Sequence, residues 1–242
     1  MSNNQTNQTG LLTEIYSNNS NDTWKMATLS SPTHQLRYFA IRDAILKRNI
    51  DNLLDLGCGN GVVEFLLPDN ITCMSYDLDT HAINLAKELN KSKKNRNFEV
   101  GDIEKLRDDN SQFQAVLISE VLEHLEDDRL LLDIAWEKLQ SGGLIFLTLP
   151  NVERFNERIR KTLKNRVKYM HSTHFREYNI QSAIDLVKDR FELLDITGVC
   201  FSVPFEQHVS QNTLTPFSVL LHRMIEHIPS LATWLLLVAQ KK

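Results

Sequence analysis

From residue 50 onward, short apolar runs alternate with stretches in which apolar residues recur at helical spacing. The runs predict strands at 52–56, 71–76, 98–100, 113–119, 144–149, 191–199 and 234–239. The stretches predict helices at 62–67, 82–89, 127–140, 181–187 and 214–228, and a further helix at 34–47 precedes the first strand. Such alternation is typical of a parallel sheet that helices cover on both faces. We therefore expect an α/β fold, a three-layer sandwich around a mostly parallel seven-stranded sheet.

The segments outside this alternation predict the domain organisation. Residues 1–33 are polar with scattered apolar positions, which predicts a flexible N-terminal arm ahead of one domain at 34–242. Residues 152–175 predict a basic lid, since positions 154–168 hold seven Lys or Arg and one acid. Residues 200–230 predict an insertion before the last strand. A charge run is usual for a solvated helix face, but a basic lid would also attract an acidic acceptor.

Composition and charge narrow the class of protein. Of the 242 residues, 42% are hydrophobic and 24% are charged, which indicates a globular chain rather than a disordered one. The 27 basic and 31 acidic residues give a net charge of −4, which excludes a generally basic protein that coats nucleic acid. The chain has three cysteines without a CxxC pair, no basic-then-apolar leader and no apolar run of about 20 residues. These features predict a cytoplasmic protein without a membrane span.

Residues with distinctive chemistry follow four of the predicted strands. The segment Gly57-Cys58-Gly59-Asn60-Gly61 follows the first strand, Asp77 the second, Asp102 the third, and Ser119-Glu120 the fourth. The carboxyl ends of parallel strands share one edge of the sheet, where ligands bind. Glycines there allow a sharp turn and the close approach of a ligand to backbone amides. Asp77 is placed to accept hydrogen bonds from both ribose hydroxyls, and Asp102 to contact an adenine amino group.

Two other interpretations apply to this pattern. Each element alone fits a tight turn or a solvated acid. A dinucleotide site also combines glycines with an acid about twenty residues later, but its glycines follow the pattern GxGxxG. Here the sixth position is Val62 and the glycines run GxGxG, which disfavours a dinucleotide oxidoreductase.

The sequence resembles the class I S-adenosylmethionine-dependent methyltransferases. The segment "LLDLGCGNG" at 53–61 looks like the family's first motif, and "SYDLD" and "VGDI" look like the segments that carry its ribose- and adenine-binding acids. Residues 116–151 resemble the fourth and fifth strands of the branch that includes ubiquinone-biosynthesis O-methyltransferases. The resemblance runs from about Arg37 to Asp195. It implies a Rossmann-like sheet whose last strand is antiparallel to the others, and S-adenosylmethionine as cofactor.

The resemblance also implies a set of cofactor-binding residues. In that branch an arginine ahead of the first strand holds the methionine carboxylate, and Arg37 stands at the matching place; otherwise it is an exposed helical arginine. The full set expected to bind the cofactor is Arg37, Asp55, Gly57, Cys58, Gly59, Gly61, Asp77, Leu78, Asp102, Ile103 and Ser119.

The candidate catalytic residues are Glu120, Glu123 and His124, together with His174 in the later segment "HSTHFREY". If the segment 120–124 begins a helix, its two carboxylates and its imidazole share one face. One hypothesis is a general base, His124 or a lid histidine, that takes the proton of an acceptor hydroxyl. The other is a Mg²⁺ or Mn²⁺ site made of these four residues. A third interpretation is that they only orient one another or cap the helix.

The function expected from these features is O-methylation of a hydroxyl on a small molecule or glycan. One alternative is a metal-dependent RNA 2′-O-methyltransferase, because small-RNA 3′-end enzymes carry a similar EVxEH segment and a strand end similar to "TLPN". Another alternative is a non-catalytic scaffold that binds the cofactor without turnover.

Overall fold

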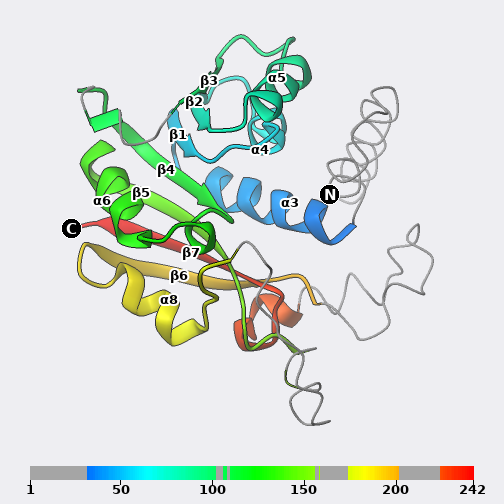
Figure 1. Ribbon diagram of the computed structural model, residues 1–242, viewed down its shortest axis with the longest axis vertical. Coiled ribbons are helices and arrows are strands. Elements are labelled where there is room, and N and C mark those ends of the chain that lie inside the picture. The colour runs from blue at the N-terminus through cyan, green and yellow to red at the C-terminus, as the bar shows by residue number, and fades with distance from the viewer. Residues whose placement is uncertain (1–31, 102–105, 108–109, 156–157, 159–173, 202–223) are drawn as a thin grey trace.

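The computed structural model describes residues 32–101, 106–107, 110–155, 158, 174–201 and 224–242 (Figure 1). Nearly all of the predicted arm at 1–33 lies outside the described residues. So do most of the predicted lid at 152–175, most of the insertion at 200–230 and most of the helix expected at 214–228.

Seven strands and the helices between them form the described structure. The strands are β1 (Asn52–Leu56), β2 (Thr72–Asp77), β3 (Arg96–Val100), β4 (Phe113–Ser119), β5 (Leu139–Pro150), β6 (Phe191–Val199) and β7 (Trp234–Lys241). The α-helices are α3 (Pro32–Leu46), α4 (Val62–Leu66), α5 (Thr80–Leu89), α6 (Asp128–Lys138) and α8 (Ile180–Val187). Two 3₁₀ turns are η2 (Leu122–His124) and η4 (Pro229–Leu231). Each predicted strand is present, with shifts of a few residues at the ends.

The strands lie in the order β3-β2-β1-β4-β5-β7-β6. Strand β7 is antiparallel to both of its neighbours, and the other pairings are parallel, so the predicted antiparallel last strand is confirmed. The chain runs outward from β1 through β2 to β3, and then returns to place β4 on the other side of β1. This reversal is the topological switch point of the sheet, the usual place for a ligand in an open α/β fold.

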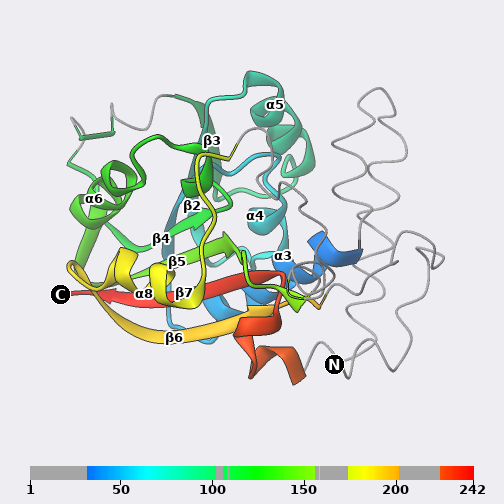
Figure 2. The same cartoon turned by 60° about the horizontal axis from the view of Figure 1, so that its bottom comes forward.

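Helices cover both faces of the sheet, as Figure 2 shows. Helices α3 and α4 pack on one face against side chains such as Leu53 and Phe146, and α6 and α8 pack on the other against Leu54 and Val116. Both faces of the central strands are therefore buried, which explains their nearly continuous apolar sequence. Among the described residues, no helix combines the length and the apolar character that crossing a membrane requires.

Two predicted boundaries were wrong. The helix expected at 127–140 ends at Lys138, and Leu139 is already extended. The segment that follows belongs to β5, where the register against β4 shifts between Leu139 and Leu144. Helix α5 is capped by Asp79, whose carboxylate accepts hydrogen bonds from the amides of the first turn. The helix predicted at 82–89 therefore begins earlier, at Thr80, directly after this cap.

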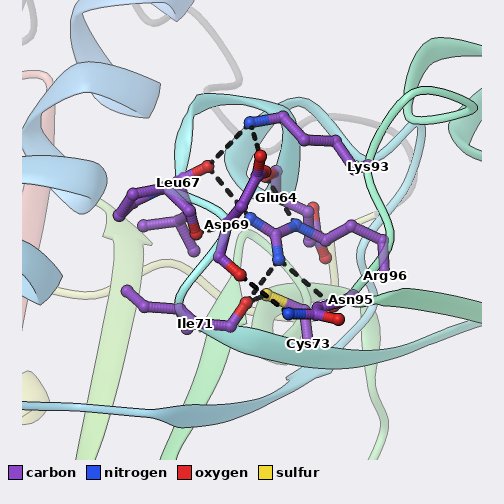
Figure 3. A network of polar contacts seen from close by, with 9 residues as sticks. Glu64, Leu67, Asp69, Ile71, Cys73, Lys93, Asn95 and Arg96 are labelled. Atoms are coloured by element: carbon purple, nitrogen blue, oxygen red, sulfur yellow. Dashed lines mark hydrogen bonds and ion pairs between the residues drawn. The ribbon is translucent and has the colours of Figure 1, made fainter.

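Arg96 on β3 fastens the connection between α4 and β2 (Figure 3). Its buried guanidinium donates hydrogen bonds to the carbonyl oxygens of Glu64, Leu67, Pro68, Ile71 and Asn95. Arginine has five N–H donors in a planar arrangement, which lysine cannot reproduce. Because α4 follows the glycine segment directly, this contact also sets where that segment begins its turn.

We predict that Arg96→Lys lowers the free energy of unfolding by roughly 2–4 kcal/mol, because several buried carbonyls lose their donors. Urea denaturation measures this change. The matched control is Arg129→Lys, whose side chain is 58% exposed beside Asp189, and for which we expect a change within about 0.5 kcal/mol. Equal effects of the two substitutions would contradict a special role for Arg96.

Candidate functional site

A cavity of about 440 Å³ opens at the carboxyl ends of β1, β2 and β4. Its walls come from α3, the glycine segment, the end of β2 and the segment after β4. The lining residues are Arg37, Tyr38, Asp55, Gly57, Cys58, Gly59, Asn60, Val62, Val63, Asp77, Leu78, Asp79, Ala82, Ser119, Glu120, Val121, His124 and Leu125. The cavity therefore lies at the switch point of the sheet.

Two glycines bring the backbone to the wall of this cavity. Gly57 and Gly59 have φ angles of +91° and +53°, a region that other residues adopt only with strain. A Cβ on Gly57 would lie 2.3 Å from Val121 Cγ2, so the two segments touch there. A Cβ on Gly59 would meet no atom of the described residues within 4 Å. It would instead take up space in the cavity that Gly59 lines.

Asp77 connects the glycine segment to the end of β2. Its Oδ2 accepts a hydrogen bond of 2.8 Å from the amide of Gly59, and its Oδ1 accepts one of 2.9 Å from the amide of Asp79. Each carboxylate oxygen can accept a second hydrogen bond, so the group could still bind two hydroxyls. Leu78, whose side chain is 70% exposed, forms an apolar rim beside it.

Arg37 enters the cavity from α3 and is only 7% exposed. Its Nη1 lies 3.2 Å from Glu120 Oε2, and its guanidinium lies over the Trp234 ring, 5.0 Å from the ring centroid. Its Nε has no hydrogen-bond partner among the described residues. A buried arginine with an unused donor at a cavity wall can receive a second carboxylate, that of a ligand.

The backbone of Glu120 has a φ of 58°, which is strained for a residue with a side chain. This conformation ends β4 and brings the carboxylate to Arg37. Burial raises the pKa of Glu120, while the neighbouring Arg37 charge lowers it. The segment 120–124 does not begin an α-helix, the condition under which its carboxylates and imidazole would share one helix face, because only the single 3₁₀ turn η2 forms after this bend.

Glu123 and His124 meet His174, which arrives from far along the chain. The backbone amide of Phe175 donates a hydrogen bond of 2.8 Å to the Glu123 carbonyl, and this contact places His174 beside η2. The His124 and His174 rings meet edge to face with centroids 4.7 Å apart. Burial, with a contribution from the nearby Glu120 charge, raises the pKa of Glu123 to about 8. The cluster therefore contains a carboxyl group, that of Glu123, that can exchange a proton near neutral pH.

The segment that carries His174 is fixed by Asp128 at the start of α6. The Asp128 carboxylate accepts a hydrogen bond of 2.8 Å from the Tyr178 hydroxyl and forms an ion pair with Arg176, also at 2.8 Å. Arg176 also donates to the carbonyl of Glu126. These contacts hold the described segment that carries His174 against the start of α6.

A metal could be held by Glu123, His124 and His174, which offer ligand atoms within 4.8 Å of one another. Glu120, the fourth residue of the predicted set, is paired with Arg37 instead. Two imidazoles and one carboxylate are poor in oxygen for Mg²⁺, and they suit Mn²⁺ or another first-row ion better.

The structure brings most of the predicted site residues to one cavity. Glu123 and His174 are not among the lining residues but lie next to His124, which is, and Gly61 faces α5, where a Cβ would lie 2.9 Å from Ala86 Cβ. Asp102 and Ile103 lie outside the described residues. The sequence analysis missed Tyr38, Asn60, Val62, Val63, Asp79, Ala82, Val121 and Leu125 among the lining residues, as well as the buried Glu64 below.

The charges around the cavity distinguish between cofactors. Four carboxyl groups line it, those of Asp55, Asp77, Asp79 and Glu120, and Arg37 is the only Lys or Arg among the described lining residues. Such a wall repels a pyrophosphate and suits a ligand that carries positive charge. The cavity thus favours a sulfonium cofactor over a dinucleotide.

A family model described as a methyltransferase domain matches residues 47–198. The chain belongs to this methyltransferase domain family. It is therefore an S-adenosylmethionine-dependent methyltransferase, as its motifs predicted. The match covers β1 to nearly the end of β6, and so includes the glycine segment and Asp77. It does not single out the ubiquinone-biosynthesis branch.

Solved structures share the fold of this methyltransferase at low sequence identity. The N-methyltransferase NodS from Bradyrhizobium japonicum WM9, in complex with S-adenosyl-L-homocysteine, matches with a TM-score of 0.62 and 16% identity over 98% of each chain. A possible histamine N-methyltransferase from Thermotoga maritima matches with a TM-score of 0.62 and 17% identity, over 91% of this chain and 95% of the other. Magnesium protoporphyrin IX methyltransferase from Synechocystis PCC 6803 matches with a TM-score of 0.60 and 11% identity, over 87% of this chain and 85% of the other.

Two glycine substitutions should separate ligand binding from stability in this methyltransferase. For Gly59→Ala we expect a loss of stability of about 1 kcal/mol from the left-handed backbone. Its affinity for S-adenosylhomocysteine should fall by at least about tenfold, because the new methyl group occupies the cavity.

For Gly61→Ala we expect the larger effect on stability rather than on ligand affinity, because its Cβ would collide with Ala86 and Phe98. Thermal unfolding and calorimetric titration measure the two quantities. If Gly59→Ala binds S-adenosylhomocysteine like the unmodified protein, the cofactor does not lie against this wall.

Proposed function

We propose that this methyltransferase methylates a hydroxyl group of a small molecule or glycan, with His124 as the proton acceptor. The observation that carries this proposal is the position of His124, which lines the cavity while its ring contacts His174 behind it. A hydroxyl acceptor must lose its proton during methyl transfer, and an imidazole at the cavity wall is suited to receive it.

The cofactor would be held by the residues that line the other side of the same cavity. Arg37 would bind its carboxylate, Asp77 would accept the ribose hydroxyls, and the backbone at Gly59 would lie against it. When bound, the cofactor supplies a methyl group already activated on a sulfonium. The chain's own task is to align the acceptor, exclude water and take up a proton.

The acceptor atom is the finer part of the proposal. By their printed descriptions, two of the similar structures are a nitrogen methyltransferase and a possible one. At this level of identity such likenesses concern the fold alone. A neutral amine acceptor needs little help with its proton, so a chain that methylates nitrogen has less use for a cluster of one buried carboxyl group and two imidazoles. The cluster therefore supports an oxygen atom, rather than a nitrogen atom, as the methyl acceptor.

We predict that His124→Ala lowers kcat with a hydroxyl acceptor by about 10²–10⁴-fold, the usual contribution of a general base. The affinity for S-adenosylhomocysteine should stay close to that of the unmodified protein, because Arg37 and Asp77 are untouched. The assay transfers an isotopically labelled methyl group to panels of hydroxyl-bearing and amine-bearing small molecules and glycans.

The matched control is His227→Ala, which removes an exposed histidine that does not line the cavity. We expect this variant to retain full activity. If only amines are methylated, and His124→Ala keeps that activity, then nitrogen is the acceptor and the general-base assignment is wrong.

The second candidate function is metal-dependent RNA 2′-O-methylation. It is favoured by the convergence of Glu123, His124 and His174, which could hold an ion at the same cavity. The basic run at 154–168 that would attract RNA lies mostly outside the described residues. The acidic lining of the cavity opposes a polyanion near its wall.

A chelator separates the two candidates. If the first holds, treatment with EDTA leaves methyl transfer unchanged, and His174→Ala has a smaller effect than His124→Ala. If the second holds, EDTA abolishes methylation of an RNA 3′ end, added Mn²⁺ restores it, and Glu123→Gln is as damaging as either histidine variant.

A further inference from the structure

Two carboxyl groups lie buried together beneath the glycine segment. Asp55 on β1 is 2% exposed and lines the cavity, and Glu64 on α4 is fully buried behind it. The two side chains are in hydrogen-bond contact with each other. Glu64 was not among the predicted site residues, and the cofactor-binding roles proposed above do not use it.

This contact requires a proton. Asp55 Oδ1 and Glu64 Oε2 are both buried, and neither has a hydrogen-bond donor among the described residues. Two ionised carboxylates only accept hydrogen bonds and repel each other, so buried pairs of this kind hold one proton between them. A proton on Asp55 supplies the missing donor and leaves a single negative charge on Glu64.

Neighbouring groups explain why Glu64 keeps the charge. The Ser75 hydroxyl on β2 donates a hydrogen bond of 2.6 Å to Glu64 Oε1, and the cation of Arg96 on β3 lies close to Glu64. Among the described residues, the charges that act most on Asp55 are those of Glu64 and of Asp77 at the end of β2, and the nearby Cys58 thiol brings no positive charge either. Burial and the nearby acids raise the pKa of Asp55 well above its usual range.

We propose that Asp55 and Glu64 form a proton-sharing floor of the cofactor cavity, which loses its proton when the positively charged S-adenosylmethionine binds. The proposal rests on the placement of the cofactor in this cavity, as proposed above. A positive charge brought to the wall that Asp55 lines stabilises the doubly ionised pair, and the displaced proton passes to solvent. S-adenosylhomocysteine lacks the sulfonium charge, so its binding releases a smaller fraction of this proton.

The sign of the pH dependence follows from this linkage. Because binding releases a proton, S-adenosylmethionine should bind more tightly as the pH rises, by up to about tenfold per pH unit for one linked proton. The two ligands share the same amino and carboxyl groups. The ratio of their dissociation constants, S-adenosylhomocysteine over S-adenosylmethionine, therefore isolates the sulfonium, and we expect it to increase with pH.

The experiment is calorimetric titration of both ligands into the full-length protein, in buffers of different ionisation enthalpy and over a range of pH. The dependence of the heat on the buffer gives the number of protons released. We expect a larger number for S-adenosylmethionine than for S-adenosylhomocysteine.

Glu64→Gln assigns the proton, because its amide can donate to an ionised Asp55 and still accept from Ser75. In this variant we expect the difference in proton number between the two ligands to vanish. The control Glu192→Gln makes the same change at an exposed position on β6 and should keep the difference. Glu120, Glu123 and His124 could also release protons on binding, but Glu64→Gln leaves them in place. Asp55→Asn provides a second test if Glu64→Gln does not fold.

The outcomes separate this inference from the proposed function. If neither ligand binds, the cofactor site itself is misplaced. If both bind with equal proton numbers and a ratio independent of pH, the cavity holds the cofactor but the proton-sharing floor is refuted. A difference that persists in both Glu64→Gln and Asp55→Asn also overturns the assignment, because the proton then comes from another group.

Discussion

The central constraint on this molecule is the reversal of strand order at the parallel pair β1 and β4. Because β2 and β3 extend the sheet one way and β4 and β5 the other, the connections leaving β1 and β4 diverge at the carboxyl edge. A cavity remains between them, and Asp55, Asp77 and Glu120 lie at or next to a strand end there, whereas Arg37 reaches the cavity from α3. The Asp77 carboxylate accepts a hydrogen bond from the Gly59 amide, which connects the glycine segment to the end of β2 and holds its backbone at the cavity wall.

Charge is distributed unevenly around that cavity. Its floor and one wall are acidic, and the single guanidinium among the described lining residues is already paired with Glu120. A ligand carboxylate must therefore share Arg37 with Glu120 or displace it. The strained backbone of Glu120 shows that the fold holds this carboxylate in place at some energetic cost. Such a device fits an amino-acid-like ligand end, which carries a carboxylate and an ammonium together.

The sequence was sufficient for those parts of the fold that follow from local pattern. Apolar runs predicted every strand, and the spacing of the glycines and of Asp77 predicted the cavity. The conformation of the segment after β4 could not be predicted, because Glu120 pairs there with Arg37, which is remote in sequence. Glu64 was not predicted as a site residue for a similar reason. In the sequence it is one acid in a short apolar helix start, and its contacts with Asp55 and Ser75 arise only when three elements pack.

The chemistry of the cofactor gives the acidic cavity a further consequence. Methyl transfer converts a sulfonium into a neutral thioether, so the ligand loses one positive charge while it is still bound. A wall rich in carboxyl groups stabilises the charged reactant more than the neutral product. If the floor formed by Asp55 and Glu64 releases a proton to solvent when the charged cofactor binds, it must regain one once the sulfonium charge is gone. The regained proton removes one of the two negative charges that held the reactant, which favours departure of the product and its replacement by fresh cofactor.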